Sequence, residues 1–314
     1  MKILIVGAGT IAKEYVKALL AQQITPIVIG RGEAKVTQLK KEYPHVEAYP
    51  GGLENWLGQN QPPKYAIVAT PIDYLAKATQ TLINAGCQNL LVEKPLTYSA
   101  LEAQELSQLA KEKDARVHIA FNRRSYRSVK EARKLIEKDG GVCSFHFDFT
   151  EAIFRIDETK FNTESQRHWG IANSSHVIDT AFYLGGKPNW IEAHQYGKAI
   201  NWHPAGSIFT GIGETTEGVP FTYHANWGCP GRWSIEIMTP KRKLLFSPME
   251  KLHQQLKDSF KIELVELNYS LDTDYKPGFY LQLKEFMDKP GYKCLMNADE
   301  LVDELRQLNE IFGY

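Results

Sequence analysis

Two side chains in this sequence of 314 residues are suited to moving a proton, Lys94 and His176. Lys94 stands in Glu93-Lys94-Pro95, directly after the apolar run 89–92, where an ammonium could hydrogen-bond a hydroxyl or polarise a carbonyl. Histidine is the side chain whose ordinary pKa lies closest to neutrality. Asp179 follows His176 by one helical turn. Its carboxylate could orient the imidazole, or its negative charge could simply stabilise the N-terminus of the helix. We favour the second, structural role. The alternative for Lys94 is an ordinary surface lysine at a strand end.

A glycine turn near the start of the chain indicates a dinucleotide. The apolar run Lys2–Val6 predicts a buried strand and Ala12–Ala21 a helix, joined by a G-x-G-x-x-A turn. Gly7 permits the tight turn, Gly9 lets backbone N–H groups approach a pyrophosphate, and Ala12 allows close helix packing. The alternative is a glycine-rich turn without a ligand.

The end of the second strand, Ile24–Ile29, bears on which cofactor is bound. NAD-binding folds usually place an Asp or Glu there for the ribose 2′-hydroxyl, but this sequence has Gly30-Arg31-Gly32. Arg31 could hold a 2′-phosphate, and the glycines would leave room for it. We therefore predict NADP(H), with NAD(H) also possible if Arg31 is only a solvated loop residue.

The first part of the chain alternates strands with helices as far as the strand Arg116–Phe121. This alternation predicts an α/β fold with a doubly wound parallel sheet, a Rossmann domain over residues 1–122. Ala69-Thr70-Pro71 ends another strand at the edge where such sheets bind ligands. The residues expected to bind the cofactor are Gly7, Gly9, Thr10, Ile11, Ala12, Gly30, Arg31, Ala69, Thr70, Pro71, Glu93 and Lys94.

These motifs resemble the glucose–fructose oxidoreductase, inositol dehydrogenase and rhizopine catabolism (Gfo/Idh/MocA) family. The resemblance rests on five segments: the glycine turn 7–12, residues 69–71, residues 93–95, residues 122–124 and His176-Val-Ile-Asp179. It implies a second α/β domain, residues 123–314, built on a large, mostly antiparallel sheet. It also implies a sugar, polyol or related substrate, a catalytic His176, and a homo-oligomer, dimer or tetramer, formed through that sheet.

The residues just before His176 differ from the family pattern. An Asp often lies four residues before the catalytic histidine and a Gly two before, but this chain has Ala172 and Ser174. Asn173, or a residue of the loop 153–168, is a candidate replacement for the missing carboxylate. Arg123, Arg124 and Arg127 could bind an anionic substrate group or could be paired with acids. The substrate contacts expected from position are Asn122, Arg123, Arg124, Trp169, Asn173 and His176.

The segment 170–186 predicts a helix that carries His176 in its first turn. Asn173, Ser174 or Ser175 could cap its start, and Gly185 and Gly186 would end it. From Trp190 onward, five strands separated by short turn signals predict an antiparallel sheet. The final stretch predicts an amphipathic helix over 298–313, capped by Asn297. The family resemblance implies that this end of the chain packs back near the first domain.

Composition narrows the class of protein. The chain has 37 basic and 37 acidic residues, which argues against a general nucleic-acid surface. No apolar run has the length of a membrane span or a signal peptide, so we expect a cytoplasmic protein without a membrane partner. The 4 cysteines lie far apart without metal-ligand spacing, so we expect reduced thiols and no metal.

Together the sequence predicts an NADP-preferring oxidoreductase that moves a hydride between nicotinamide and a carbinol or carbonyl carbon. His176 is the expected acid or base, and Lys94 hydrogen-bonds the reacting oxygen. Two alternatives stay open. One is a non-catalytic NADP-binding regulator, and the other is an NAD-dependent, redox-assisted glycosidase.

Overall fold

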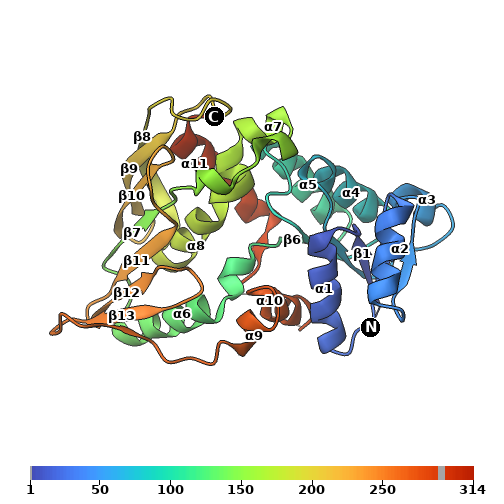
Figure 1. Ribbon diagram of the computed structural model, residues 1–314, viewed down its shortest axis with the longest axis horizontal. Helices are drawn as coiled ribbons and strands as arrows, with labels where there is room; N and C mark the ends of the chain where they lie inside the picture. Colours follow the sequence, from blue (N-terminus) through green and yellow to red (C-terminus); the bar gives the residue numbers. More distant parts are fainter. Residues whose placement is uncertain (1, 289–293) are drawn as a thin grey trace. The chain divides into compact units, whose positions relative to one another are not determined.

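The computed structural model describes residues 2–288 and 294–314, which form two compact units. The first contains Met1–Asn122 and Leu271–Asp303, and the second contains Arg123–Ser270 and Glu304–Tyr314. The predicted division into residues 1–122 and 123–314 stays a prediction. In this grouping, residues 271–303 are part of the first unit. Figure 1 shows both units coloured along the chain.

The first unit is built on a seven-stranded sheet in the order β15-β6-β5-β4-β1-β2-β3. All pairs are parallel except β15 with β6. Strands β1, β4 and β5 are buried at every position, as expected when helices cover both faces of a parallel sheet. The predicted doubly wound sheet is thereby confirmed. The strands are β1 Ile3–Val6, β2 Ile27–Ile29, β3 Glu47–Tyr49, β4 Tyr65–Val68, β5 Asn89–Val92, β6 Arg116–Ile119 and β15 Met296–Asn297.

The segment Leu271–Asp303 is joined to this unit by side-chain packing against α1 and by strand pairing with β6. Tyr15 of α1 and Phe279 of α10 have ring centroids 4.5 Å apart, and both side chains are buried. Met296 of β15 pairs with Ile119 at the sheet edge. The helices are α1 Thr10–Ala21, α2 Glu33–Glu42, α3 Leu53–Leu57, α4 Ile72–Asn84, α5 Ala100–Glu112, α9 Ser270–Thr273 and α10 Phe279–Met287.

The second unit is built on an eight-stranded sheet in the order β14-β13-β12-β11-β7-β10-β9-β8. Its pairs are antiparallel apart from β7 with β10, which confirms the mostly antiparallel prediction. Strands β13 and β14 were not predicted from the sequence, because β13 carries mainly polar residues and β14 has only 3 residues. The strands are β7 Ser144–Asp148, β8 Pro188–Tyr196, β9 Ile208–Thr215, β10 Pro220–Asn226, β11 Ser234–Met238, β12 Arg242–Phe246, β13 His253–Leu256 and β14 Ile262–Leu264.

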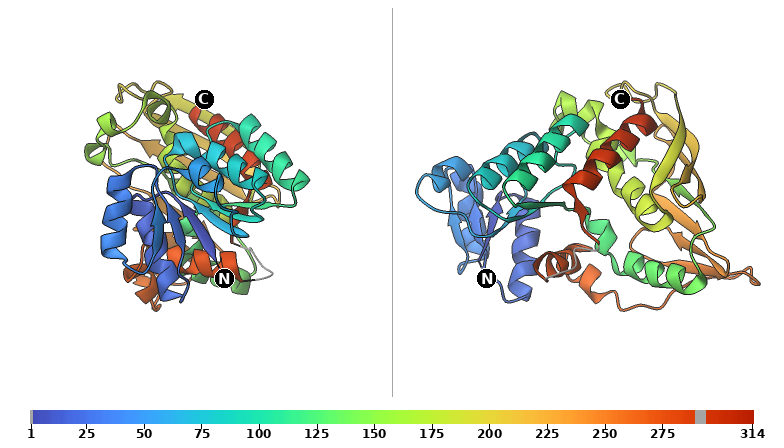
Figure 2. Two further views of the ribbon diagram at one scale, coloured as in Figure 1. Left: turned by 90° about the vertical axis from the view of Figure 1, so that its right-hand side faces the viewer. Right: turned by 180° about the vertical axis from the view of Figure 1, so that it is seen from behind.

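Helices lie along one face of this sheet (Figure 2). Aromatic side chains form the core between the sheet and these helices. Phe147 contacts Phe182 of α8 at 5.4 Å between ring centroids, and Phe149 contacts Phe312 of α11 at 5.3 Å. The remaining helical segments are η1 Asn122–Ser125, α6 Arg127–Asp139, η2 Ile153–Arg155, η3 Glu158–Lys160, α7 Thr163–Arg167, the π-helical η4 Gly170–Ser174, α8 Ser175–Gly185 and α11 Ala298–Phe312.

The last helix begins with reciprocal hydrogen bonds at its N-terminus. The Glu300 amide donates to Asn297 Oδ1 at 2.9 Å, and the Asn297 amide donates to Glu300 Oε2 at 2.8 Å. This is the cap that the sequence predicted. No helix in the described ranges, 2–288 and 294–314, has the length and apolarity needed to cross a membrane.

Candidate active site

The two glycines of the glycine turn have different surroundings. Gly7 has φ +126°, and a Cβ added there would lie 2.2 Å from the Ala69 carbonyl oxygen. Gly9 caps α1, and an added Cβ would meet nothing within 4 Å. The first-turn amides of Thr10, Ile11 and Ala12 have no intrahelical acceptor. The helix starts at Thr10, two residues before the predicted start at Ala12, because Gly9 takes the extended N-cap conformation.

The same sheet edge collects the ends of β4 and β5. The Ala69 amide donates to Val6 O at 2.8 Å, and the Glu93 amide donates to Val68 O at 2.9 Å. Residues 7, 69 and 93 therefore follow three adjacent parallel strands at their carboxyl ends. Thr70 is partly buried there, and Pro71 precedes α4. The sheet thus gathers the glycine turn, the 69–71 segment and Lys94 on one edge.

Gly30 and Gly32 serve different purposes. A Cβ on Gly30 would lie 2.5 Å from Val36 Cγ2 and 2.9 Å from Ala8 Cβ, so this glycine permits helix packing and does not leave space for a phosphate. Gly32, in contrast, has nothing within 4 Å of an added Cβ. The expectation that both glycines make room therefore holds only for Gly32.

Arg31 is exposed at the end of β2, near Tyr74 of α4. Burial and the Glu54 carboxylate raise the pKa of Tyr74 to about 12, and the positive charge of Arg31 opposes that shift. The Tyr74 hydroxyl lies 2.6 Å from both carboxylate oxygens of Glu54. Arg31 thus places an exposed positive charge at the strand end where sequence reasoning expected a ribose contact.

Lys94 lies at the end of β5 beside a partly buried polar contact that was not predicted from the sequence. The Tyr15 hydroxyl donates to Glu93 Oε1 at 2.6 Å, and the Tyr15 side chain is fully buried. Burial raises the pKa of Glu93, while the Tyr15 hydroxyl and the charges of Lys94 and Lys276 oppose the rise. The Lys94–Pro95 peptide is cis. A signal was present in the sequence, since Tyr15 follows Ala12 by one helical turn and shares its buried face.

His176 lies at the start of α8, in the second unit. The capping prediction for Asn173, Ser174 or Ser175 is wrong, because the π-helical turn 170–174 continues directly into α8. Ser174 occupies the N-cap position but makes no capping hydrogen bond. The predicted end is confirmed, since α8 stops at Gly185 and Gly186 has φ +115°.

Glu151 is a further candidate that sequence reasoning missed. Its buried carboxylate accepts hydrogen bonds from Asn173 Nδ2 at 2.9 and 3.0 Å and from Ser174 Oγ at 2.6 Å. These bonds explain why the Asn173 and Ser174 side chains do not cap α8. A carboxylate is therefore fixed against the turn that precedes His176, although residue 172 is Ala. Glu151 lies between the end of β7 at Asp148 and the 153–168 loop in which a replacement was expected.

The three clustered arginines have separate environments. Arg124 donates to the fully buried Asp179 through Nε at 2.9 Å and Nη2 at 2.5 Å. Arg127 Nε donates to the Asn268 carbonyl at 3.3 Å. The guanidinium of Arg123 instead lies 4.8 Å from the centre of the Trp233 ring. Asp179 therefore pairs with Arg124, which agrees with the structural role that we favour for Asp179.

His176, Trp233 and Arg123 form one cluster within the second unit. The rings of His176 and Trp233 have centroids 6.4 Å apart. Trp233 is partly buried immediately before β11, whereas Trp227 is buried and donates to Phe149 O at 3.2 Å. A cation, an aromatic face and an imidazole from separate elements thus meet at one place.

Two other residues predicted to contact the substrate, Trp169 and Asn122, are buried against other parts of the protein. Trp169 is buried, with ring centroids 4.8 Å from Phe161 and 5.4 Å from Trp202. Asn122 is buried in the first unit, and its Nδ2 donates to the Pro277 carbonyl at 2.9 Å. These contacts give both side chains roles in packing.

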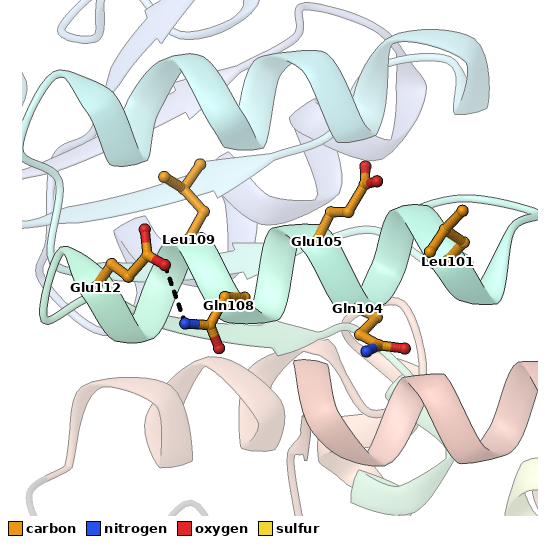
Figure 3. Close-up of a pocket in the computed structure, with 6 residues that line it drawn as sticks. All are labelled: Leu101, Gln104, Glu105, Gln108, Leu109 and Glu112. Carbon is orange, nitrogen blue, oxygen red and sulfur yellow. Dashed lines mark hydrogen bonds between the residues drawn. The ribbon is translucent and has the colours of Figure 1, made fainter.

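A shallow hollow lies elsewhere, on α5 (Figure 3). All of its lining residues come from this single helix, and Gln108 Nε2 donates to Glu112 Oε1 at 2.9 Å. It contains no candidate site residue. Among residues 2–288 and 294–314, no group of three or more His, Cys, Asp or Glu side chains is arranged to hold a metal ion. The lining residues are Leu101, Gln104, Glu105, Gln108, Leu109 and Glu112.

The first part of the chain matches a known protein family. Residues 1–121 match the GFO_IDH_MocA oxidoreductase family with an NAD-binding Rossmann fold. Over these residues, the chain is similar to the Gfo/Idh/MocA family. The resemblance drawn from the sequence motifs is thereby confirmed.

Two curated proteins match part of the chain. One is scyllo-inositol 2-dehydrogenase (NADP(+)) IolW of Bacillus subtilis, 26% identical over 189 residues, which cover 57% of this chain and 49% of that protein. The other is an uncharacterised oxidoreductase of Schizosaccharomyces pombe, 30% identical over 166 residues, covering 51% and 44%. The chain spans about half the length of the curated relatives it matches.

The fold also matches solved structures. An oxidoreductase from Agrobacterium radiobacter, crystallised with NAD+, L-tartaric acid and magnesium, aligns with a TM-score of 0.82. The alignment covers 98% of this chain and 94% of that one at 11% identity. At this identity the likeness establishes the fold alone.

Proposed function

We propose that this protein is an NAD(P)-dependent oxidoreductase acting on a CH–OH group of a sugar-like or polyol substrate. One observation carries the proposal: Lys94 lies at the same sheet edge as an open glycine turn with unused first-turn amides. Because Gly9 leaves space and Thr10 is exposed, the turn fits a pyrophosphate. When bound, the nicotinamide would supply or accept the hydride.

Residues of the chain would bind the cofactor, stabilise charge on the reacting oxygen and transfer the proton. Residues 7–12 would hold the pyrophosphate through backbone N–H groups, and Arg31 would hold a 2′-phosphate. Lys94 would donate a hydrogen bond to the reacting oxygen, which stabilises negative charge developing there. His176 would take or return the hydroxyl proton. A substrate related to inositol is supported by the name of the B. subtilis relative.

We further infer that NADP(H) is preferred. Arg31 stands where a carboxylate would accept from an unmodified ribose, and the B. subtilis relative is named for NADP(+). The structural neighbour, in contrast, was crystallised with NAD+.

Lys94→Ala tests the proposal. The wild-type protein is first given polyols, sugars, sugar acids and sugar nucleotides with NADP+ or NAD+, and cofactor absorbance is followed. We expect Lys94→Ala to lose about 10²–10⁴-fold in kcat, because its hydrogen bond acts in the transition state. The dissociation constant of NADPH should change less than about threefold, a shift below roughly 0.7 kcal/mol.

Lys113→Ala is the matched control, since Lys113 is exposed at the end of α5 and should retain wild-type turnover. Full turnover by Lys94→Ala would refute the role given to Lys94. Binding of NADPH without turnover of any substrate would instead favour a regulatory protein. Release of free sugar with no net change in cofactor would indicate a redox-assisted glycosidase.

A further inference from the structure

The guanidinium of Arg123 is held by aromatic rings and has no acidic partner. It lies 4.8 Å from the centre of the Trp233 ring and 5.8 Å from that of Tyr126. Within residues 2–288 and 294–314, it forms no ion pair, and its buried Nε has no hydrogen-bond acceptor. The neighbouring Arg124, in contrast, is paired with Asp179.

The aromatic rings hold the guanidinium in position but do not accept hydrogen bonds from its N–H groups as a carboxylate would. A ring face attracts a guanidinium by about 0.5–2 kcal/mol, but it does not replace directional acceptors for five N–H donors. A carboxylate or phosphate would accept two parallel hydrogen bonds from the same planar group. Arg123 is therefore held in place with its capacity to bind an anion unused.

The position relative to His176 suggests which anion is bound. Trp233 lies between the two side chains in the contact network, 4.8 Å from the Arg123 guanidinium and 6.4 Å from the His176 ring. An anion on Arg123 would thus be bound close to the imidazole that we propose moves the proton. The formal net charge of +0 provides no general attraction for anions, so the selectivity would be local.

We propose that Arg123 binds a carboxylate or phosphate carried by the sugar-like substrate, and that Trp233 packs against the carbon skeleton of that substrate. The proposal rests on the proposed oxidoreductase function and specifies its substrate class. Aromatic rings bury apolar C–H surface well, and the Trp233 side chain is partly exposed.

The first test measures anion binding without turnover. Inorganic phosphate and D-glucuronate are each titrated by calorimetry into wild-type protein, Arg123→Met and Arg133→Met, with saturating NADPH to cover the cofactor turn. Arg133 is the matched control because it is exposed and lies 4.5 Å from the Tyr183 ring. We expect at least one anion to bind the wild type and Arg133→Met at least tenfold more tightly than Arg123→Met. Equal binding by all three proteins, or no saturable binding, would overturn the proposal.

The second test measures selectivity during turnover. Matched neutral, carboxylate and phosphate substrates, such as D-glucose, D-glucuronate and D-glucose 6-phosphate, are compared by kcat/KM. Arg123→Met should raise KM for the anionic substrate at least tenfold and change kcat little, and Arg123→Lys should restore part of the loss. An equal effect on neutral and anionic substrates would contradict the proposal.

The two tests separate the two proposals. Anion binding that depends on Arg123, without hydride transfer to any substrate, would refute the oxidoreductase function and retain the anion site. Hydride transfer with a preference for neutral substrates would refute only the anion site. Thermal unfolding of Arg123→Met within a few degrees of the wild type ensures that a loss of binding is not a loss of fold.

Discussion

Arginine side chains of similar sequence context have different roles because their immediate neighbours differ. Arg124 forms an ion pair with the fully buried carboxylate of Asp179, so removing Arg124 would take away that ion pair. Arg123 lies over an aromatic ring, and we propose that it binds an anionic group of the substrate. Arg31 is exposed at the end of β2, next to the open position of Gly32. Residue type alone does not distinguish these roles.

Arg31→Gln should reduce the preference for NADP(H). We expect the dissociation constant of NADPH to rise about tenfold, because a charge-assisted hydrogen bond to a phosphate contributes roughly 1.5–3 kcal/mol. The dissociation constant of NADH should change less than about twofold. Fluorescence titration of both cofactors checks this, with Lys40→Gln in the exposed last turn of α2 as control. A wild-type preference for NADH, or an equal loss for both cofactors, would refute the role of Arg31.

The position of α8 is set by buried polar contacts at several points along it. Glu151 holds the turn before the helix through Asn173 and Ser174. Arg124 pairs with Asp179 in its middle. Glu304 of α11 is buried near Asp179, and burial together with that carboxylate raises the pKa of Glu304 to about 8, while Arg124 opposes the rise. The helix that carries His176 is therefore anchored from other elements as well as by apolar packing.

The raised pKa of Glu304 predicts a pH-dependent stability. Between the unfolded pKa near 4.5 and the folded pKa of about 8, the folded protein binds one more proton than the unfolded chain. The free energy of unfolding should therefore fall as pH rises through this window, by at most about 1.4 kcal/mol per pH unit from this group. Below and above the window, the group contributes no slope.

Glu304→Gln tests this dependence, because glutamine keeps the shape and stays neutral. Chemical unfolding at pH 6, 7 and 8 should show a shallower decline in the variant than in the wild type. Glu310→Gln, in the same helix, provides the control because the Glu310 side chain is exposed. Parallel declines in wild type and Glu304→Gln would exclude Glu304 as the source.

At the scale of the whole molecule, exposed apolar side chains occur along the edges of the eight-stranded sheet. Phe260 is 100% exposed between β13 and β14, and β14 is an edge strand with free backbone groups. Apolar groups concentrated at an edge favour association with another chain. The exposed apolar residues of the edge strands and their hairpin are Trp190, Tyr196, Leu256, Phe260, Ile262 and Leu264.

We expect the protein to form a homo-oligomer that uses this sheet. Light scattering after size exclusion should give a mass that is a multiple of 35.7 kDa. The double variant Phe260→Ser, Ile262→Lys should lower that mass, because the edge strand loses apolar surface and gains a charge. Leu101→Ser on α5 is the control for removing an exposed apolar side chain elsewhere. A monomeric mass at all concentrations would refute the prediction.

The sequence by itself determined the features that depend on residues close together in the chain. The glycine turn follows from steric limits at Gly7, where only a hydrogen atom fits beside the Ala69 carbonyl. The alternation of strands and helices predicted the parallel sheet, and the turn signals after Trp190 predicted the antiparallel one. Lys94 and His176 were identified because their local contexts match a chemistry, and their catalytic roles stay predictions.

Only the tertiary structure decided which distant residues meet. Glu151 faces Asn173 and Ser174, Tyr15 faces Glu93, and Arg123 faces Trp233, each across a separation that local patterns do not encode. The same reason explains why residues 271–303 join the first unit, since Phe279 packs on Tyr15 and β15 extends the sheet. Burial and pairing are properties of the assembled core, so the partner of each charged side chain was fixed only by folding.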